Sequence, residues 1–212
     1  MNYRNLLSLA CVAAIGLATV IVTVVVADPA SESKPQMQLP PGWTEADMQA
    51  CMAAGTPGDM HKHLAQGVGE WKCKTTMWMA PDTEPMTSDG TSTVTLVMDG
   101  RYAKCDIVGQ MPGMGPYNAT GIYGFDNVSQ KFVSTFIDNH STGIMNGTGK
   151  LSSDGKTLTW NYTFNCPLTK KPAVMREVET MTGENTKTLE AFGTDPKSGK
   201  EFKMMSIELT RN

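Results

Sequence analysis

The chain of 212 residues lacks an excess of charge of either sign. Its 18 lysine and arginine residues and its 21 aspartate and glutamate residues are spread without long blocks, and the formal net charge is −3. Proteins that bind nucleic acid concentrate basic residues on one face, because the phosphate backbone is densely charged. We therefore expect no nucleic-acid partner.

Histidine is scarce, and the signature motifs of common enzymes are absent. The sequence contains three histidines and no H-E-x-x-H, G-x-S-x-G or glycine-rich phosphate-binding segment. His61 and His63 stand two positions apart on an expected helix, about 200° apart around its axis, so that helix cannot direct both at one metal ion. We predict no catalytic residue and no cofactor, and enzymatic activity is not favoured.

Charge is missing altogether from a long segment near the N-terminus. Residues 6–27 form an apolar run that follows Arg4. The run is longer than the apolar core of most cleaved signal peptides and is long enough to span a bilayer. We expect residues 1–27 to be a signal peptide or a signal anchor. The protein would then be periplasmic or extracellular, with residues 6–27 as a candidate tether to the cytoplasmic membrane.

The cysteines lack the C-x-x-C spacing of thiolate metal sites. Cys11 lies in the apolar run, and the other four are Cys51, Cys73, Cys105 and Cys166. An even number of cysteines in an exported protein is typical of disulfides. We predict two disulfides among these four, with free core thiols as an alternative, and all three pairings stay open.

The remaining chain is organised as a linker and one domain. Residues 28–42 are rich in proline and serine and indicate a linker. A single domain is expected over residues 43–212, beginning with short helices near 44–54 and 59–66. From residue 67 the pattern alternates with period two between turn signals. The expected strands are 70–80, 89–98, 101–109, 117–125, 131–138, 142–150, 156–164, 172–181, 186–193 and 200–211.

Short, evenly spaced turns favour an all-β, antiparallel up-and-down meander. Asp99-Gly100 and Ser153-Asp154-Gly155 are typical hairpin signals. A meander of this many strands with one buried face closes most simply into a barrel, which leaves no unpaired edge. A two-sheet sandwich is the alternative.

Aromatic side chains supply a candidate wall for a binding site. Trp160, Tyr162 and Phe164 alternate with polar residues along one strand, which predicts that all three face the interior. Tyr123, on the strand near 117–125, is included in the same candidate ligand-binding set.

Arg176 completes that set. The period-two pattern of residues 173–181 places Arg176 on the same face as Val174 and Val178, toward the interior. A buried guanidinium needs an anionic partner. We expect this partner to be the carboxylate of a ligand or, alternatively, an internal acid such as Asp138.

Gly69-Glu70-Trp71 resembles the G-x-W signature that opens the barrel of lipocalins and other calycins. In such proteins an arginine near the last strand packs over the tryptophan, and Arg211 is the matching position here. A longer set of segments resembles the bacterial domain-of-unknown-function family 1579, namely 68–79, 85–97, 100–102, 125–138, 141–145 and 200–211. This resemblance implies a calycin-like barrel of about eight to ten strands on an exported protein, with no established activity.

Methionine is abundant, with sixteen residues. Met111 and Met114 stand three apart in a loop, an arrangement that suits soft metals such as Cu(I), and His61 and His63 could add nitrogen ligands. The alternative is that methionine fills an irregular interior, because its side chain is unbranched and adaptable.

The leading functional hypothesis is an exported, lipocalin-like binding protein for a small apolar or amphipathic molecule. Two alternatives remain: a methionine- and histidine-based copper-binding protein, and a filled barrel that acts in protein–protein interaction. The volume of the interior distinguishes the first hypothesis from the last. The sequence does not indicate an oligomeric state.

Overall fold

The computed structural model describes residues 39–212. The expected signal segment at 1–27 and most of the linker lie outside the described residues. Within 39–212, none of the helices has both the length and the apolar character needed to cross a bilayer.

Two short helices precede ten strands. They are α1 (Glu45–Ala54), α2 (Asp59–Ala65), β1 (Gly69–Met77), β2 (Met86–Val97), β3 (Tyr102–Met111), β4 (Gly115–Asp126), β5 (Lys131–Asp138), β6 (Met145–Leu151), β7 (Thr157–Asn165), β8 (Pro172–Met181), β9 (Thr186–Thr194) and β10 (Glu201–Arg211).

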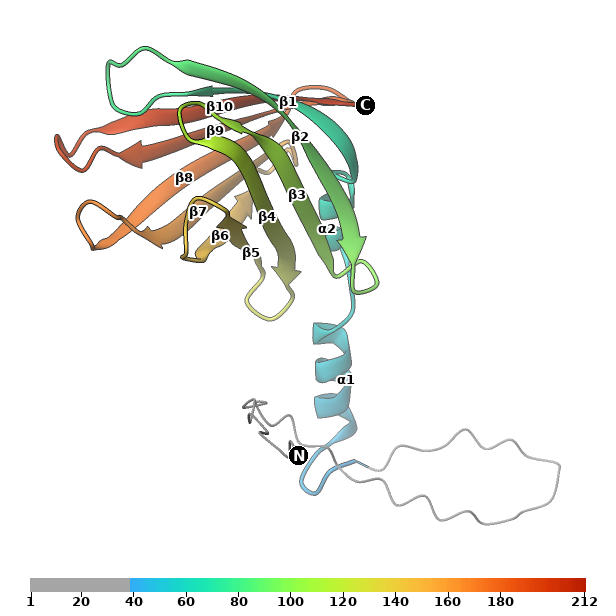
Figure 1. Cartoon of the computed structure of the whole chain (residues 1–212). Helices are drawn as coiled ribbons and strands as arrows, with labels where there is room; N and C mark the ends of the chain where they lie inside the picture. Colours follow the sequence, from blue (N-terminus) through green and yellow to red (C-terminus); the bar gives the residue numbers. More distant parts are fainter. Residues whose placement is uncertain (1–38) are drawn as a thin grey trace, which may run out of the picture. The chain divides into compact units, whose positions relative to one another are not determined.

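The strands form one closed antiparallel barrel (Figure 1). Each strand pairs with its neighbours in the sequence, and β1 pairs with β10 to close the ring. Closure leaves no free sheet edge, so every strand of the meander has a hydrogen-bonded neighbour on both sides. The predicted fold class is confirmed, and the sandwich alternative is wrong.

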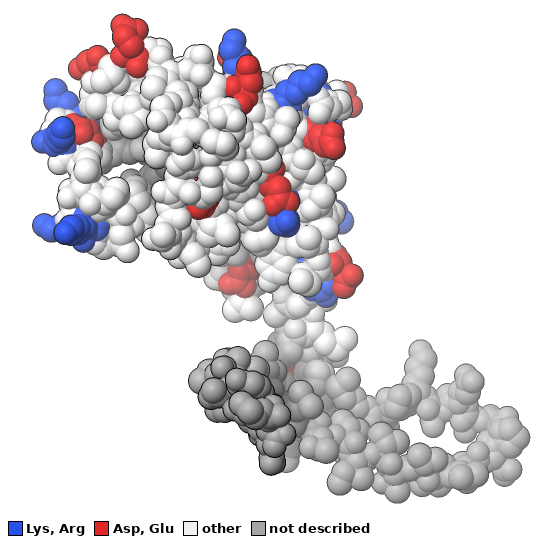
Figure 2. All heavy atoms as spheres, in the orientation of Figure 1, with Lys and Arg blue, Asp and Glu red and all other residues white. Residues whose placement is uncertain are grey.

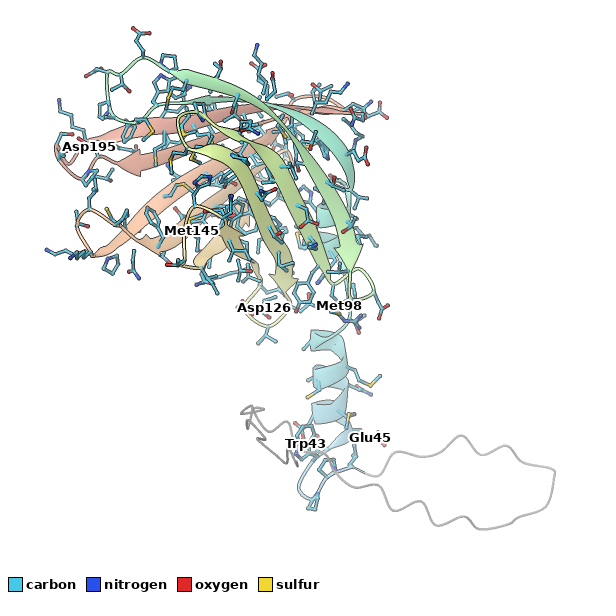
Figure 3. All side chains as sticks on the ribbon, in the orientation of Figure 1. Trp43, Glu45, Met98, Asp126, Met145 and Asp195 are labelled. Carbon is cyan, nitrogen blue, oxygen red and sulfur yellow. The ribbon has the colours of Figure 1, made fainter. Side chains whose placement is uncertain are left out.

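The two ends of the barrel differ. The β2–β3 and β4–β5 turns, marked by Met98 and Asp126, lie at the end close to the helices, and Met145 and Asp195 mark the opposite end (Figure 3). Helix α2 packs against β3 and β4, and its Leu64 contacts the buried core. We call these the helix-covered end and the far end.

The core has two parts on the inner face of the barrel. One is centred on Trp71 with Cys73, Val94, Ala103 and Leu209. The other contains Phe132, Leu158, Trp160 and Tyr162.

Helix α1 lies outside this core. None of its residues is buried, and Thr44 begins the helix with a capping box that it forms with Asp47. Its last turn is attached to the barrel because Asn127 donates hydrogen bonds to the carbonyl oxygens of Ala53, Ala54 and Thr56.

The outer surface carries charges of both signs. On the face drawn in Figure 2, basic and acidic side chains are interspersed among uncharged ones. No basic patch for a polyanion is visible on this face.

Candidate binding cavity

The interior of the barrel contains a cavity of about 260 Å³. Inward-facing side chains from most strands line it, and His63 and Leu64 of α2 contribute from the helix-covered end. Most of the lining is apolar, including Met77, Ile107 and Ile207. A cavity of this kind can hold a small molecule whose surface is mainly hydrocarbon.

Glu177 and Glu179 of β8 face the cavity, and Arg176 does not. The register of the β7–β8 hairpin sets this orientation, because Trp160 is directly opposite Glu177 and paired residues share a face of the sheet. Trp160 is 1% exposed and points inward, so Glu177 must do the same. The inward orientation predicted for Arg176 is therefore wrong.

Arg176 lies on the outer surface of the barrel. Its guanidinium carbon is 4.1 Å from the centroid of the Phe192 ring, and one of its nitrogens lies 3.5 Å from a carboxylate oxygen of Glu201. The proposed internal partner Asp138 instead accepts a hydrogen bond from the backbone amide of His140.

Lys187 of β9 forms a salt bridge with Glu179 inside the barrel. The ammonium nitrogen lies 2.6 Å from a Glu179 carboxylate oxygen and 4.8 Å from the centroid of the Trp71 ring. Burial alone would lower the pKa of Lys187, but the charge of Glu179 and the hydrogen bond to it outweigh burial and raise this pKa. Lys187 is therefore charged at neutral pH and already paired.

Glu177 has no such partner. Its side chain is nearly buried, with 9% of the residue exposed, and within residues 39–212 no side chain or backbone group forms a hydrogen bond or salt bridge with its carboxyl group. Burial raises the pKa of Glu177 to about 8, the charge of Glu179 adds to this shift, and Lys187 opposes it. The protonated form of Glu177 is consequently the favoured one at neutral pH.

Aromatic rings surround this acid. The centroids of Tyr123 and Trp160 are 5.5 Å apart, and those of Trp160 and Tyr162 are 6.0 Å apart. Tyr123 and Trp160 line the cavity, whereas Tyr162 and Phe164 continue along the inner face of β7 beyond the lining. The indole nitrogen of Trp160 is buried without a hydrogen-bond partner among the described residues. Of the five predicted ligand-binding residues, the structure places Tyr123 and Trp160 at the cavity and Tyr162 beside Trp160, leaves Phe164 outside the lining, and puts Arg176 on the outer surface.

Trp71 and Arg211 meet at the helix-covered end. Trp71 is 0% exposed, and the Arg211 guanidinium carbon lies 4.2 Å from the centroid of its ring. Arg211 also donates hydrogen bonds to the carbonyl oxygens of Val68 and Gln66. Gly69 has a φ of +134°, and a β-carbon there would lie 2.8 Å from an Arg211 nitrogen. Both constraints favour glycine two positions before the tryptophan.

The four described cysteines are free thiols, so the predicted disulfides are wrong. Cys73 on β1 and Cys105 on β3 are separated by β2, and they are opposite different residues of it, Gly90 and Val94, so their backbones are more than about 10 Å apart. A disulfide requires Cα atoms about 4.4–6.8 Å apart. Cys51 is exposed on α1, and Cys166 lies between β7 and β8.

The candidate copper ligands do not assemble. His61 and His63 belong to α2 at the helix-covered end, and Met111 ends β3 at the far end, with Met114 in the turn that follows. A strand of this length spans about 30 Å. His61 also accepts a hydrogen bond from the amide of Gly58 through Nδ1. Within 39–212, no cluster of three or more His, Cys, Asp or Glu side chains is arranged to bind a metal ion.

The acidic and basic groups of the cavity were missed from the sequence. The orientation predicted for Arg176 implies that its neighbours Glu177 and Glu179 face outward, and the alternating pattern gives no separate signal for Lys187 on β9. The signal that could have identified them is the β7–β8 loop, whose length pairs Asn165 with Pro172 and hence Trp160 with Glu177.

The comparisons with known proteins agree with this architecture. A crystal structure of Rv2717c from M. tuberculosis is similar with a TM-score of 0.55 and 13% identity, covering 74% of this chain and 99% of that one. The S-type phycobiliprotein lyase CPES from Guillardia theta is similar with a TM-score of 0.50 and 8% identity, covering 72% and 92%. No curated protein matches in sequence. The family model described as "Protein of unknown function (DUF1579)" matches residues 56–211, and the chain belongs to this family.

Proposed function

We propose that this protein binds a small, largely apolar molecule inside the barrel and does not transform it. The observation that carries the proposal is the interior cavity of about 260 Å³, lined mainly by apolar side chains with a few buried polar groups. Small-molecule sites have this composition, because apolar contact supplies affinity and a few polar groups fix orientation. Closed barrels of similar size, such as the lipocalins, hold one small ligand.

The volume argues for a compact ligand. Pockets for drug-sized molecules occupy about 300–1,000 Å³, so this cavity lies just below their lower limit. A filled barrel acting through its outer surface has no need for an interior space of this kind. Export through residues 1–27 is part of the proposal, and it would place the ligand outside the cytoplasm.

A neutral fluorescent probe tests the proposal. N-phenyl-1-naphthylamine should bind the purified protein with a saturable rise in fluorescence, because transfer of this apolar probe from water into an apolar cavity lowers its free energy. Ile107→Trp adds bulk to the cavity lining and should weaken binding at least tenfold. Val174→Trp adds the same ring to β8 at a position that is 57% exposed and should leave binding within twofold.

Two results would contradict the proposal. The first is absence of saturable binding by the wild type. The second is equal binding by both tryptophan variants, which would place the probe on the surface. Native mass spectrometry of the purified protein gives an independent readout, since a co-purifying organic mass is expected in place of a metal.

A further inference from the structure

The charged groups of the cavity are unevenly paired. Three charged side chains from β8 and β9 are wholly or largely buried in its wall, namely Glu177, Glu179 and Lys187. Lys187 is bonded to Glu179 and packs on the Trp71 ring, so its positive charge is already matched. The unmatched group is an acid, Glu177, and its ionisation would give this set a net charge of −1.

An anionic ligand fits this arrangement poorly. A carboxylate in the cavity would add negative charge next to Glu179, and next to Glu177 once that acid ionises. Of the two lysines that line the cavity, Lys187 is engaged by Glu179, and Lys156 is exposed to solvent in the β6–β7 turn. Separating Lys187 from Glu179 would leave a half-buried carboxylate unpaired, which is unfavourable in a largely apolar cavity. Once Glu177 ionises, the unsatisfied capacity of the cavity is therefore for a hydrogen-bond donor or a positive charge.

The aromatic surroundings suit a cation as well. Trp160 is directly opposite Glu177, and it packs against Tyr123 and Tyr162. The faces of such rings carry negative partial charge and attract organic cations. A carboxylate beside aromatic rings in an apolar cavity is a suitable environment for an ammonium group on a hydrocarbon body.

We propose that the cavity takes an apolar molecule with a single protonated amine, and that its ammonium group pairs with Glu177. This inference rests on the proposed function and specifies the class of ligand. On binding, the ammonium donates hydrogen bonds to the ionised Glu177 carboxylate, and the proton that Glu177 held is released to solvent.

Proton release makes the affinity depend on pH. Below the Glu177 pKa of about 8, each bound ammonium must displace a proton, so the affinity should rise up to tenfold per pH unit between pH 6 and pH 8. Above that range the affinity should level off, because Glu177 is already ionised and an alkylamine, like lysine, is still protonated. The titratable groups facing Glu177 are Glu179, Lys187, Tyr117, Tyr123 and Tyr162.

None of these neighbours produces the same dependence. The pKa values of the three tyrosines are raised by burial, so the tyrosines stay neutral throughout this range. The pKa of Lys187 is also raised, so Lys187 stays charged. His63, whose pKa is lowered by burial, faces Glu179 and titrates on the acid side.

Matched eight-carbon competitors test the proposal. Octylamine, octanol and octanoate would each displace N-phenyl-1-naphthylamine from the wild-type protein at pH 6.0, 7.0, 8.0 and 8.5. At pH 8.5 octylamine should compete at least tenfold better than octanol, and octanoate should compete least well. The octylamine advantage should shrink towards pH 6.0, while octanol should show no such trend.

Glu177→Gln keeps the size of the side chain and removes its charge. This variant should still bind the neutral probe, should lose the preference for octylamine over octanol, and should lose the rise with pH. Glu208→Gln removes an exposed carboxylate from the outer face of β10 and should behave as the wild type.

The possible results separate this inference from the proposed function. Absence of probe binding by the wild type overturns both. Probe binding without an octylamine preference overturns only the ammonium proposal, and a preference for octanol that Glu177→Gln abolishes would instead assign a neutral hydrogen-bonding ligand. An octylamine preference that survives in Glu177→Gln also overturns the proposal, because the charge would then lie elsewhere.

Discussion

The helix-covered end and the cavity both bury polar groups, but they differ in whether those groups have hydrogen-bond partners. At the helix-covered end, the Trp71 indole donates to the Gly67 carbonyl oxygen over 2.9 Å, and Arg211 donates to Gln66 over 2.8 Å. In the cavity, the Glu177 carboxyl group has no partner among the described residues. The first region pairs its tryptophan and arginine, whereas the second leaves the Glu177 carboxyl group and the Trp160 indole nitrogen without partners among the described residues.

This difference distinguishes buried polar groups that stabilise the fold from buried polar groups that a ligand could bind. A paired buried group adds to stability or leaves it unchanged, whereas an unpaired one lowers stability unless something else binds it. An acid with a strongly shifted pKa in a cavity is for this reason a candidate functional residue. The Trp71 region should therefore be sensitive to mutation, and the Glu177 region should be sensitive to pH.

The largest effect is expected at Trp71. Trp71→Ala should lower the free energy of unfolding by about 3–5 kcal/mol, because it removes a fully buried aromatic side chain and leaves a cavity. Trp43→Ala removes the same side chain from a position that is 45% exposed and should change stability by less than about 0.5 kcal/mol. Urea denaturation followed by circular dichroism measures both. Equal midpoints for the two variants would contradict a structural role for the helix-covered end.

A smaller effect is expected from the pH dependence of Glu177. Its pKa is about 8 in the folded protein against an ordinary value of 4.5, so the folded state retains a proton that the unfolded state releases. The free energy of unfolding should fall as the pH rises from about 5 to 8, by on the order of 2–4 kcal/mol, and should then level off. Denaturant unfolding across this range measures the loss.

Glu177→Gln isolates that contribution. The variant should lack the fall, and the difference between it and the wild type should grow with pH up to about 8. The comparison is needed because His63 acts in the opposite direction. Burial lowers its pKa, so its contribution to stability increases as the pH rises towards the ordinary histidine value of 6.5. A difference independent of pH would mean that Glu177 is already ionised and paired.

The smallest effect is expected at Arg176. Arg176→Met should change the free energy of unfolding by less than about 1 kcal/mol, because the pair with Glu201 is 3.5 Å long and solvent-exposed. It should also leave probe binding unchanged, since the side chain does not line the cavity. Urea denaturation measures this change. A decrease of several kcal/mol in the free energy of unfolding would show that Arg176 is buried, which would contradict the contrast between the two regions.

The fold could be predicted from the sequence because its signals are local. Alternation along the strands and turn residues such as Asp99-Gly100 define the ten strands, and closure follows from the cost of free edges. Gly69-Glu70-Trp71 located the start of the barrel. The prediction of disulfides is wrong because cysteine pairing depends on which strands are neighbours, and β2 lies between Cys73 and Cys105.

The site could be predicted only in part. The aromatic wall emerged because Trp160 and Tyr162 alternate with polar residues. Strand β8 is ambiguous, since valine occupies one face and methionine, alanine and two acids occupy the other. Hydrophobicity alone favoured the valine face, but the hairpin register placed the acids inside. Acids on the inner face of a barrel go against the hydrophobic pattern, so that pattern is least informative for the strand that carries them.

The seam between β1 and β10 has a consequence for how the barrel forms and opens. Nine of the strand pairings join neighbours in the sequence, whereas the seam joins the two ends of the domain, and Arg211 reaches a residue 143 positions away. Contacts that close so long a loop form slowly, so we expect β1 and β10 to pair last during folding. Trp71 and Arg211 are directly paired there. Contacts made after the folding transition state govern the unfolding rate. We therefore expect the contact between Trp71 and Arg211 to slow unfolding of the closed barrel.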